Sequence, residues 1–143
     1  MTGKFEIGFG PHLLVEGWRC PYHVLNSREV LHNFLDELPD LIGMTKISPP
    51  NGFRYNSHCA DELGLSGFIL IAESHISVHT YPNKGSVAID IFSCKQFDVD
   101  ATVRFCEQSF RIGQVRSRLA DRGLEFPRDT GAVTEFLRKE RGR

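Results

Sequence analysis

The run ESHISVHTYP, which occupies residues 73–82, decides how this chain folds. From Ile76 onward, β-branched residues alternate with Ser, His and Tyr, and this period of two is typical of a half-buried β-strand. A strand that needed polar groups only for solubility would more often carry Lys, Glu or Thr than two histidines. We therefore interpret the polar face of this strand as a candidate site of chemistry. The alternative is a half-buried strand whose histidines are merely hydrogen-bonded.

Two further strands are predicted beside this run. The apolar sequence GFILIAE predicts a strand over residues 67–73, and the run itself predicts one over 75–81. A third, over 86–92, follows after a link of four residues and leads directly into Ser93 and Cys94. Short links of this kind indicate antiparallel neighbours. The centre of the protein is therefore predicted to be an antiparallel sheet.

Two amphipathic helices are expected around this sheet. The first has an apolar stripe at helical spacing that consists of Val30, Leu31, Phe34, Leu35 and Leu38. Asn26 or Ser27 would cap its start, and Pro39 would stop it. The second helix would run over about residues 99–112 and end at Gly113.

The remaining segments complete the expected order of elements. A first strand is predicted over 12–18, a short one over 43–48, and a last one around Val115 and Leu119. Residues 51–64 are polar and are expected to form an irregular loop. A short C-terminal helix through Val133, Phe136 and Leu137 would precede a frayed tail.

This order supplies helices for one sheet face only. It predicts an α+β fold: a two-layer sandwich with a largely antiparallel sheet and helices on one face, formed by residues 1–143 as a single domain. The other face of the sheet would be bare and would need a partner.

Composition narrows the classes of function. The chain has 143 residues, 41% of them hydrophobic, and a formal net charge of -1, so nothing favours binding to nucleic acid or to a membrane. Its apolar runs are far shorter than the roughly 20 residues of a membrane span, and no signal segment opens the chain, so the cytoplasm is expected. Its cysteines have no metal-binding spacing and are expected to be free thiols: Cys20, Cys59, Cys94 and Cys106. No metal is predicted.

The order of these motifs resembles a known family. An apolar strand, then ESH at 73–75, HTYP at 79–82 and DIFSC at 90–94 is similar to the signature of the prokaryotic S-adenosylmethionine decarboxylase proenzymes. The resemblance extends over nearly the whole chain through GPHLL at 10–14, LIGMTK at 41–46 and RGLEFPRD at 122–129.

The resemblance implies a self-processing enzyme. The chain would cut itself between Glu73 and Ser74 into a β chain of residues 1–73 and an α chain of residues 74–143, whose first residue becomes a covalent pyruvoyl group. That group would form a Schiff base with the substrate and take up the electrons left by CO₂. The product would be the aminopropyl donor of spermidine and polyamine biosynthesis. A homodimer of processed protomers, with active sites at or near their junction, is also implied.

The residue types suit these roles. The Ser74 hydroxyl can attack the carbonyl of Glu73, and His79 is our candidate base for processing, because histidine side chains commonly serve as bases near neutral pH, in agreement with the resemblance. On one straight strand Ser74 and His79 would lie roughly 16 Å apart, so we predict a hairpin or sharp kink near residues 74–75.

Two further residues are assigned through the resemblance. Cys94 matches the residue that donates a proton in decarboxylation, and from the sequence alone a buried structural thiol is the alternative. Ser66 matches a serine at the family's active site, although the local sequence would equally suit an ordinary serine in a turn before a strand.

One difference from the family signature leaves the identity of the substrate undecided. Many family members carry Glu directly after the HTYP motif, where this chain has Asn83. Arginine or ornithine is therefore an alternative substrate, because pyruvoyl chemistry does not involve the side chain. A non-catalytic paralogue that binds a partner through the bare sheet face is a second alternative. A metal-binding module built from His75, His79 and a cysteine is a distant third.

Overall fold

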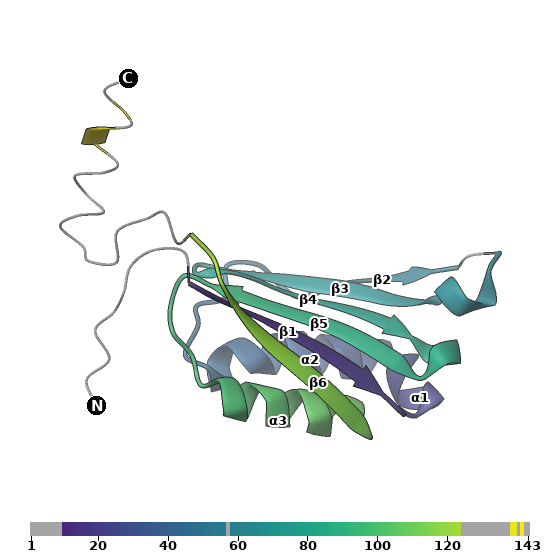
Figure 1. The fold of residues 1–143 in the computed structure, drawn as a ribbon. Helices are drawn as coiled ribbons and strands as arrows, with labels where there is room; N and C mark the ends of the chain where they lie inside the picture. Colours follow the sequence, from purple (N-terminus) through teal and green to yellow (C-terminus); the bar gives the residue numbers. More distant parts are fainter. Residues whose placement is uncertain (1–9, 57, 124–137, 140, 142–143) are drawn as a thin grey trace.

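The computed structural model describes residues 10–56, 58–123, 138–139 and 141, and within them one six-stranded antiparallel sheet is covered by helices on one face (Figure 1). The elements in chain order are β1 Pro11–Trp18, α1 Tyr22–Leu25, α2 Arg28–Leu41, β2 Asn51–Tyr55, η1 Ala60–Glu62, β3 Gly64–Ile71, β4 Ser74–Tyr81, η2 Pro82–Lys84, β5 Ser86–Ser93, α3 Val99–Phe110 and β6 Gln114–Asp121. The strands lie in the order β2-β3-β4-β5-β1-β6. The predicted α+β sandwich is confirmed.

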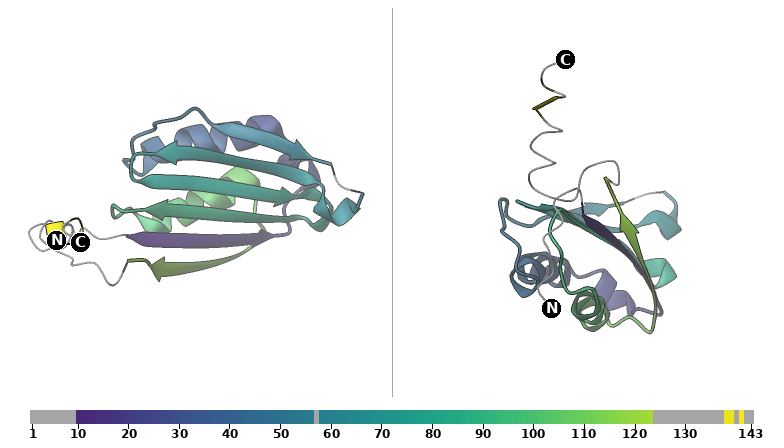
Figure 2. Two further views of the ribbon diagram at one scale, coloured as in Figure 1. Left: turned by 90° about the horizontal axis from the view of Figure 1, so that it is seen from above. Right: turned by 60° about the vertical axis from the view of Figure 1, so that its left-hand side comes forward.

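The core lies between the sheet and the two long helices, α2 and α3, which Figure 2 shows against the same sheet face. Alternate residues of the central strands point into it, and Ile76, Ile91 and Ile69 are fully buried. On the helix side, the rings of Phe34 and Phe110 lie 4.9 Å apart between their centroids. Burial of these large apolar side chains is the main stabilising term of the fold.

Both helices begin as the sequence indicates and end differently. The Ser27 hydroxyl accepts a hydrogen bond from the Val30 amide at 3.2 Å, and Asp98 caps α3 in the same way. Pro39 was expected to stop α2, but the helix continues to Leu41 because its last turn still closes through the amide of Ile42. The helix α3 ends at Phe110, before Gly113, and is capped by Arg111, which adopts the left-handed conformation.

The expected strand over 43–48 and the expected loop over 51–64 are both wrong in part. Residues 43–48 form only an isolated bridge, between Lys46 and Ile71, whereas residues 51–55 form the edge strand β2. Pro49 and Pro50, which separate the two stretches, have no backbone N–H to give to a ladder. The expected helix through residues 133–137 lies outside the described residues.

The outer face of the sheet carries no helix in the described part of the chain (Figure 2). On strands β2 and β3 this face exposes large apolar side chains, which are Phe53, Tyr55, Phe68 and Leu70. Polar residues of β4, including His75 and His79, face the same side. Exposed apolar surface of this kind commonly marks an interaction site. No helix of the described residues is long and apolar enough to cross a membrane.

Candidate active site

Ser74 lies at the start of β4, directly after the two-residue turn that joins β3 to β4. It pairs with Ile71 across this hairpin, so the predicted hairpin is present, just ahead of the residues expected. Its φ angle is 153°, in a region that residues with a side chain rarely adopt. Such backbone strain costs about 1–3 kcal/mol and is typical of functional sites. The peptide bond between Glu73 and Ser74 is therefore held at a strained position.

The carbonyl group of Glu73 is also fixed in place, by a hydrogen bond. Its oxygen accepts a hydrogen bond from the backbone N–H of Cys94 at 2.9 Å, because Ser74 lies opposite Ser93 on β5. An N–H donor placed on a carbonyl oxygen stabilises the negative charge that develops there during nucleophilic attack. The thiol of Cys94 is exposed. The structure thus brings Glu73, Ser74 and Cys94 together at one end of the sheet.

His79 and Ser66 form a separate pair. They lie opposite each other on β4 and β3, and the Ser66 hydroxyl is 2.9 Å from Nδ1 of His79. His79 is on the same continuous strand as Ser74, so the two residues remain roughly 16 Å apart along the strand. The hairpin was expected to bring His79 to Ser74. It does not, because the turn lies before Ser74 and the strand runs on from there.

A cluster of ionisable and aromatic residues lies on the outer face near Ser74. Nε2 of His12 is 3.1 Å from Oδ1 of Asp90, and the Arg122 guanidinium lies 4.1 Å from the ring centroid of Phe92. His75 lies on the opposite side of Phe92 from His12, and the centroids of the His75 and Phe92 rings are 5.8 Å apart. Burial lowers the pKa of His75, and the nearby His12 and Arg122 lower it further. At neutral pH His75 is therefore an uncharged ring.

Sequence reasoning missed this cluster. The partner of His12, Asp90, lies 78 residues away in the chain and reaches it through the pairing of β1 with β5. Only the strand order creates this contact, so no local pattern could have indicated it.

The sequence of the whole domain identifies the family. The sequence model described as S-adenosylmethionine decarboxylase matches residues 11–123, which include every strand of the sheet. The chain belongs to the S-adenosylmethionine decarboxylase family. It is 30% identical over 115 residues to the S-adenosylmethionine decarboxylase proenzyme of Archaeoglobus fulgidus, a match that covers 80% of this chain and 97% of the relative. The proenzyme of Moorella thermoacetica is 27% identical over 87% of this chain and 95% of its own.

A solved structure supports the fold of this decarboxylase family member. The crystal structure of the adenosylmethionine decarboxylase from Aquifex aeolicus matches it with a TM-score of 0.68 over 82% of this chain and 92% of the other, at 22% sequence identity. Members of this family depend on a pyruvoyl group that is made from an internal serine by self-cleavage. A serine at a strained peptide bond, with its neighbouring carbonyl already polarised, fits the formation of that group.

Asn83, where the chain departs from the family signature that it resembles, makes a hydrogen bond that a glutamate could not make. Its Nδ2 atom donates a hydrogen bond to the carbonyl oxygen of Ala60 at 2.7 Å, which joins η2 to the segment before β3. A carboxylate cannot donate this bond. Asn83 therefore lacks the negative charge of a glutamate, and it instead links η2 to η1 through a hydrogen bond.

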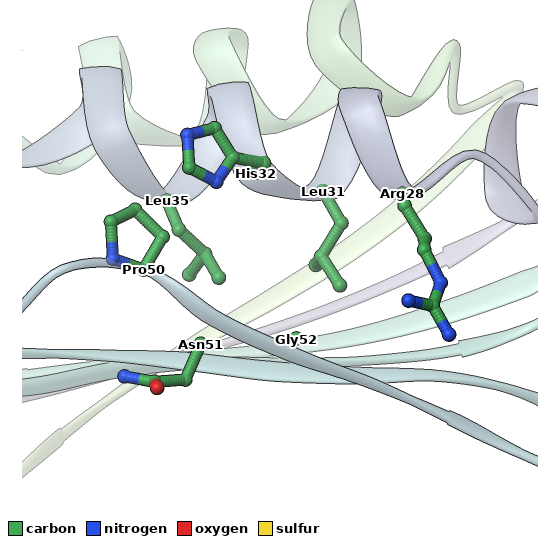
Figure 3. A pocket seen from close by; sticks show the side chains of 7 residues that line it. All are labelled: Arg28, Leu31, His32, Leu35, Pro50, Asn51 and Gly52. Carbon is green, nitrogen blue, oxygen red and sulfur yellow. The ribbon is translucent and has the colours of Figure 1, made fainter.

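Other features of the decarboxylase lie away from Ser74. A groove of about 130 Å³ lies between α2 and β2 on the helix side of the sheet, and its lining mixes apolar side chains such as Leu31 and Leu35 with the polar Arg28, His32 and Asn51 (Figure 3). Burial raises the pKa of Cys20 to about 11 and that of Cys106 to about 12, so neither is a thiolate at neutral pH. Cys20, Cys94 and Cys106 are free thiols. In the described ranges no three His, Cys, Asp or Glu side chains gather as metal ligands would.

Proposed function

We propose that this chain cuts itself between Glu73 and Ser74 and then decarboxylates S-adenosylmethionine, yielding the aminopropyl donor for polyamine synthesis. Membership of the family and the names of the relatives support the reaction and the substrate. The observation that carries the cleavage site is the geometry of one peptide bond. Ser74 adopts a strained φ, and the carbonyl oxygen before it already accepts a hydrogen bond from Cys94.

The cleavage chemistry follows from these residues. The Ser74 hydroxyl attacks the Glu73 carbonyl carbon, and the Cys94 N–H stabilises the negative charge on the carbonyl oxygen. The Glu73–Ser74 C–N bond breaks and leaves an ester. A base removes the α-proton of residue 74, and the Glu73 carboxylate departs with the ester oxygen. The dehydroalanine that remains tautomerises and reacts with water, releasing ammonia and leaving a pyruvoyl group at the new N-terminus.

The base for this reaction comes from a second copy of the chain. His79 cannot reach Ser74 along its own strand, but its ring and that of Phe68 lie on the outer sheet face, which no described element covers. A two-fold dimer through these faces would bring the His79 and Ser66 of one protomer to the end of its partner's sheet where β4 begins with Ser74. The exposed apolar residues of β2 and β3 support an interface there.

The mature enzyme would use the same residues differently. A pyruvoyl group at position 74 supplies the electron-withdrawing carbonyl that makes loss of CO₂ feasible. Cys94 has an exposed thiol and its backbone contacts Glu73, so it is placed to return a proton to the substrate carbon. An ordinary thiol is mostly protonated at neutral pH and can act as an acid.

The test combines mass and activity. Purified wild-type protein should give two masses, for residues 1–73 and for a pyruvoyl-started chain 74–143, whereas Ser74→Ala should stay one chain. Processed protein should release CO₂ from carboxyl-labelled S-adenosylmethionine and not from arginine or ornithine. A wild type that stays intact after prolonged incubation refutes the cleavage site, and release from arginine or ornithine alone refutes the substrate.

A further inference from the structure

We propose that residues 43–48, which we call the strap, position the peptide bond between Glu73 and Ser74 for self-cleavage. This inference rests on the proposed function. Its acting residues are Thr45, whose backbone holds the Glu73 side chain, and Lys46, which fixes the strap to α2. Neither residue belongs to the reacting groups, so both act as positioning residues.

The strap is bonded to the turn that carries the scissile bond. The N–H of Thr45 donates to both carboxylate oxygens of Glu73, at 3.3 and 3.2 Å. The Thr45 carbonyl oxygen accepts from the N–H of Ala72 at 2.8 Å, and the N–H of Ile47 donates to Leu70 at 3.1 Å. Ala72 and Glu73, the two residues of the β3–β4 turn, are therefore both hydrogen-bonded to the backbone of Thr45.

The strap is fixed at its other side to α2. Nζ of Lys46 lies 3.2 Å from Oδ1 of Asp36 and 3.1 Å from Oδ2 of Asp40, and it also donates to the Asp36 carbonyl at 3.2 Å. These hydrogen bonds raise the pKa of Lys46, with Asp40 the larger cause, so the cation persists. Near the end of β5, Lys95 donates to the carbonyl of Gly43 at 3.0 Å.

These contacts hold the acyl side of the scissile bond at two points. The Cys94 N–H holds the main-chain oxygen of Glu73, and the Thr45 N–H holds its side chain. When the Ser74 oxygen attacks, the Glu73 carbonyl carbon cannot swing away, and the turn cannot relax to release the strained φ of Ser74. Without the strap contacts the turn would relax, and the attack would become slower.

The experiment follows processing in time after cell-free synthesis, by the conversion of one chain into two. Glu73→Leu, which removes both acceptor oxygens, should process about tenfold or more slowly, as expected for loss of a hydrogen bond to a charged group. Glu73→Gln keeps one acceptor and should be intermediate. Lys46→Met should be slower by up to about fivefold, since its ion pairs are exposed. Lys46→Arg should restore the rate.

Four controls separate positioning from general damage. Arg104→Met removes an exposed cation from α3 and should process like wild type. The melting temperatures of Lys46→Met and Arg104→Met, each in the uncleavable Ser74→Ala background, should match within a few degrees. Once processed, Lys46→Met should turn over S-adenosylmethionine at the wild-type rate per cleaved chain. A double variant, Lys46→Met with Glu73→Leu, should be no slower than Glu73→Leu alone, because both changes break the same connection.

The outcomes are distinguishable. A wild type that never cleaves overturns the proposed function and this inference with it. A wild type that cleaves alongside a Glu73→Leu chain that cleaves equally fast overturns the inference alone. Rate losses that multiply in the double variant also overturn it, since Lys46 would then act independently of Glu73.

Discussion

Exchange of the processing base between protomers can be tested by mixing two inactive variants. Ser74→Ala lacks the proposed nucleophile, and His79→Ala lacks the proposed base. On strand β4 these residues lie five positions apart, or about 16 Å, whereas a base must come within about 3 Å of the proton it removes. A site that needs both residues is therefore complete in the mixed dimer only if they come from different chains.

The expected yield follows from random pairing. With equal amounts of the two variants, about half of all dimers are mixed, and each mixed dimer has one site with both Ser74 and His79. About half of the His79→Ala chains should then cleave. Alone, these chains should process slower by about 10²–10⁴, the usual effect of a missing acid–base group.

The assay is co-expression of the variants with tags of different size, followed by mass spectrometry of each chain. The converse mixture is the control: wild type with a Ser74→Ala, His79→Ala double variant. Here mixed dimers have no complete site, so about half of the wild-type chains should stay intact. Cleavage of the His79→Ala chains no faster in the mixture than alone, with full cleavage of wild type in the control, would refute the shared site.

Two further predictions concern single residues. Cys94→Ala keeps the backbone N–H that holds Glu73, so it should still cleave to an appreciable extent while decarboxylation falls by about 10²–10⁴; equal CO₂ release by both enzymes would remove the thiol from the mechanism. His75→Gln, compared with wild type in the Ser74→Ala background, should flatten the pH dependence of stability. The folded-state pKa of His75 lies below its usual 6.5, so the unfolded chain binds the proton more readily and wild-type stability falls as the pH drops below that value. Urea unfolding at about pH 7.5 and about pH 5.5 measures this difference, and equal losses for both proteins would contradict it.

Local patterns were sufficient for the central strands and the helix starts. The alternation around Ile76 predicted β4, and the hydroxyl of Ser27 caps α2 as such residues do elsewhere. The edge strand β2 was missed because its sequence, NGFRY, follows two prolines and carries exposed side chains, so it has no buried face to create a pattern. Pro39 was misleading because it lies in the last turn of α2, where one lost bond does not unravel the helix.

The sequence could name candidate site residues, but it could not specify all the contacts among them. Ser74, Cys94 and Glu73 could be named from their motif, and the structure places them together. His79 belongs to the same motif, but its distance from Ser74 depends on whether the strand bends, which the sequence does not specify. The contacts of Thr45 and Lys46 with residues far along the chain arise only from tertiary packing.

The strand order has a consequence for the two pieces that the proposed cleavage between Glu73 and Ser74 would produce. The piece that ends at Glu73 supplies β1, β2 and β3, and the other supplies β4, β5 and β6. In the sheet these are interleaved, because β1 of the first piece lies between β5 and β6 of the second. Three ladders, β3–β4, β1–β5 and β1–β6, would have to open before the pieces could part. The proposed cut would therefore end the covalent chain without separating the strands, and the interleaved sheet would have to form while the chain is still whole.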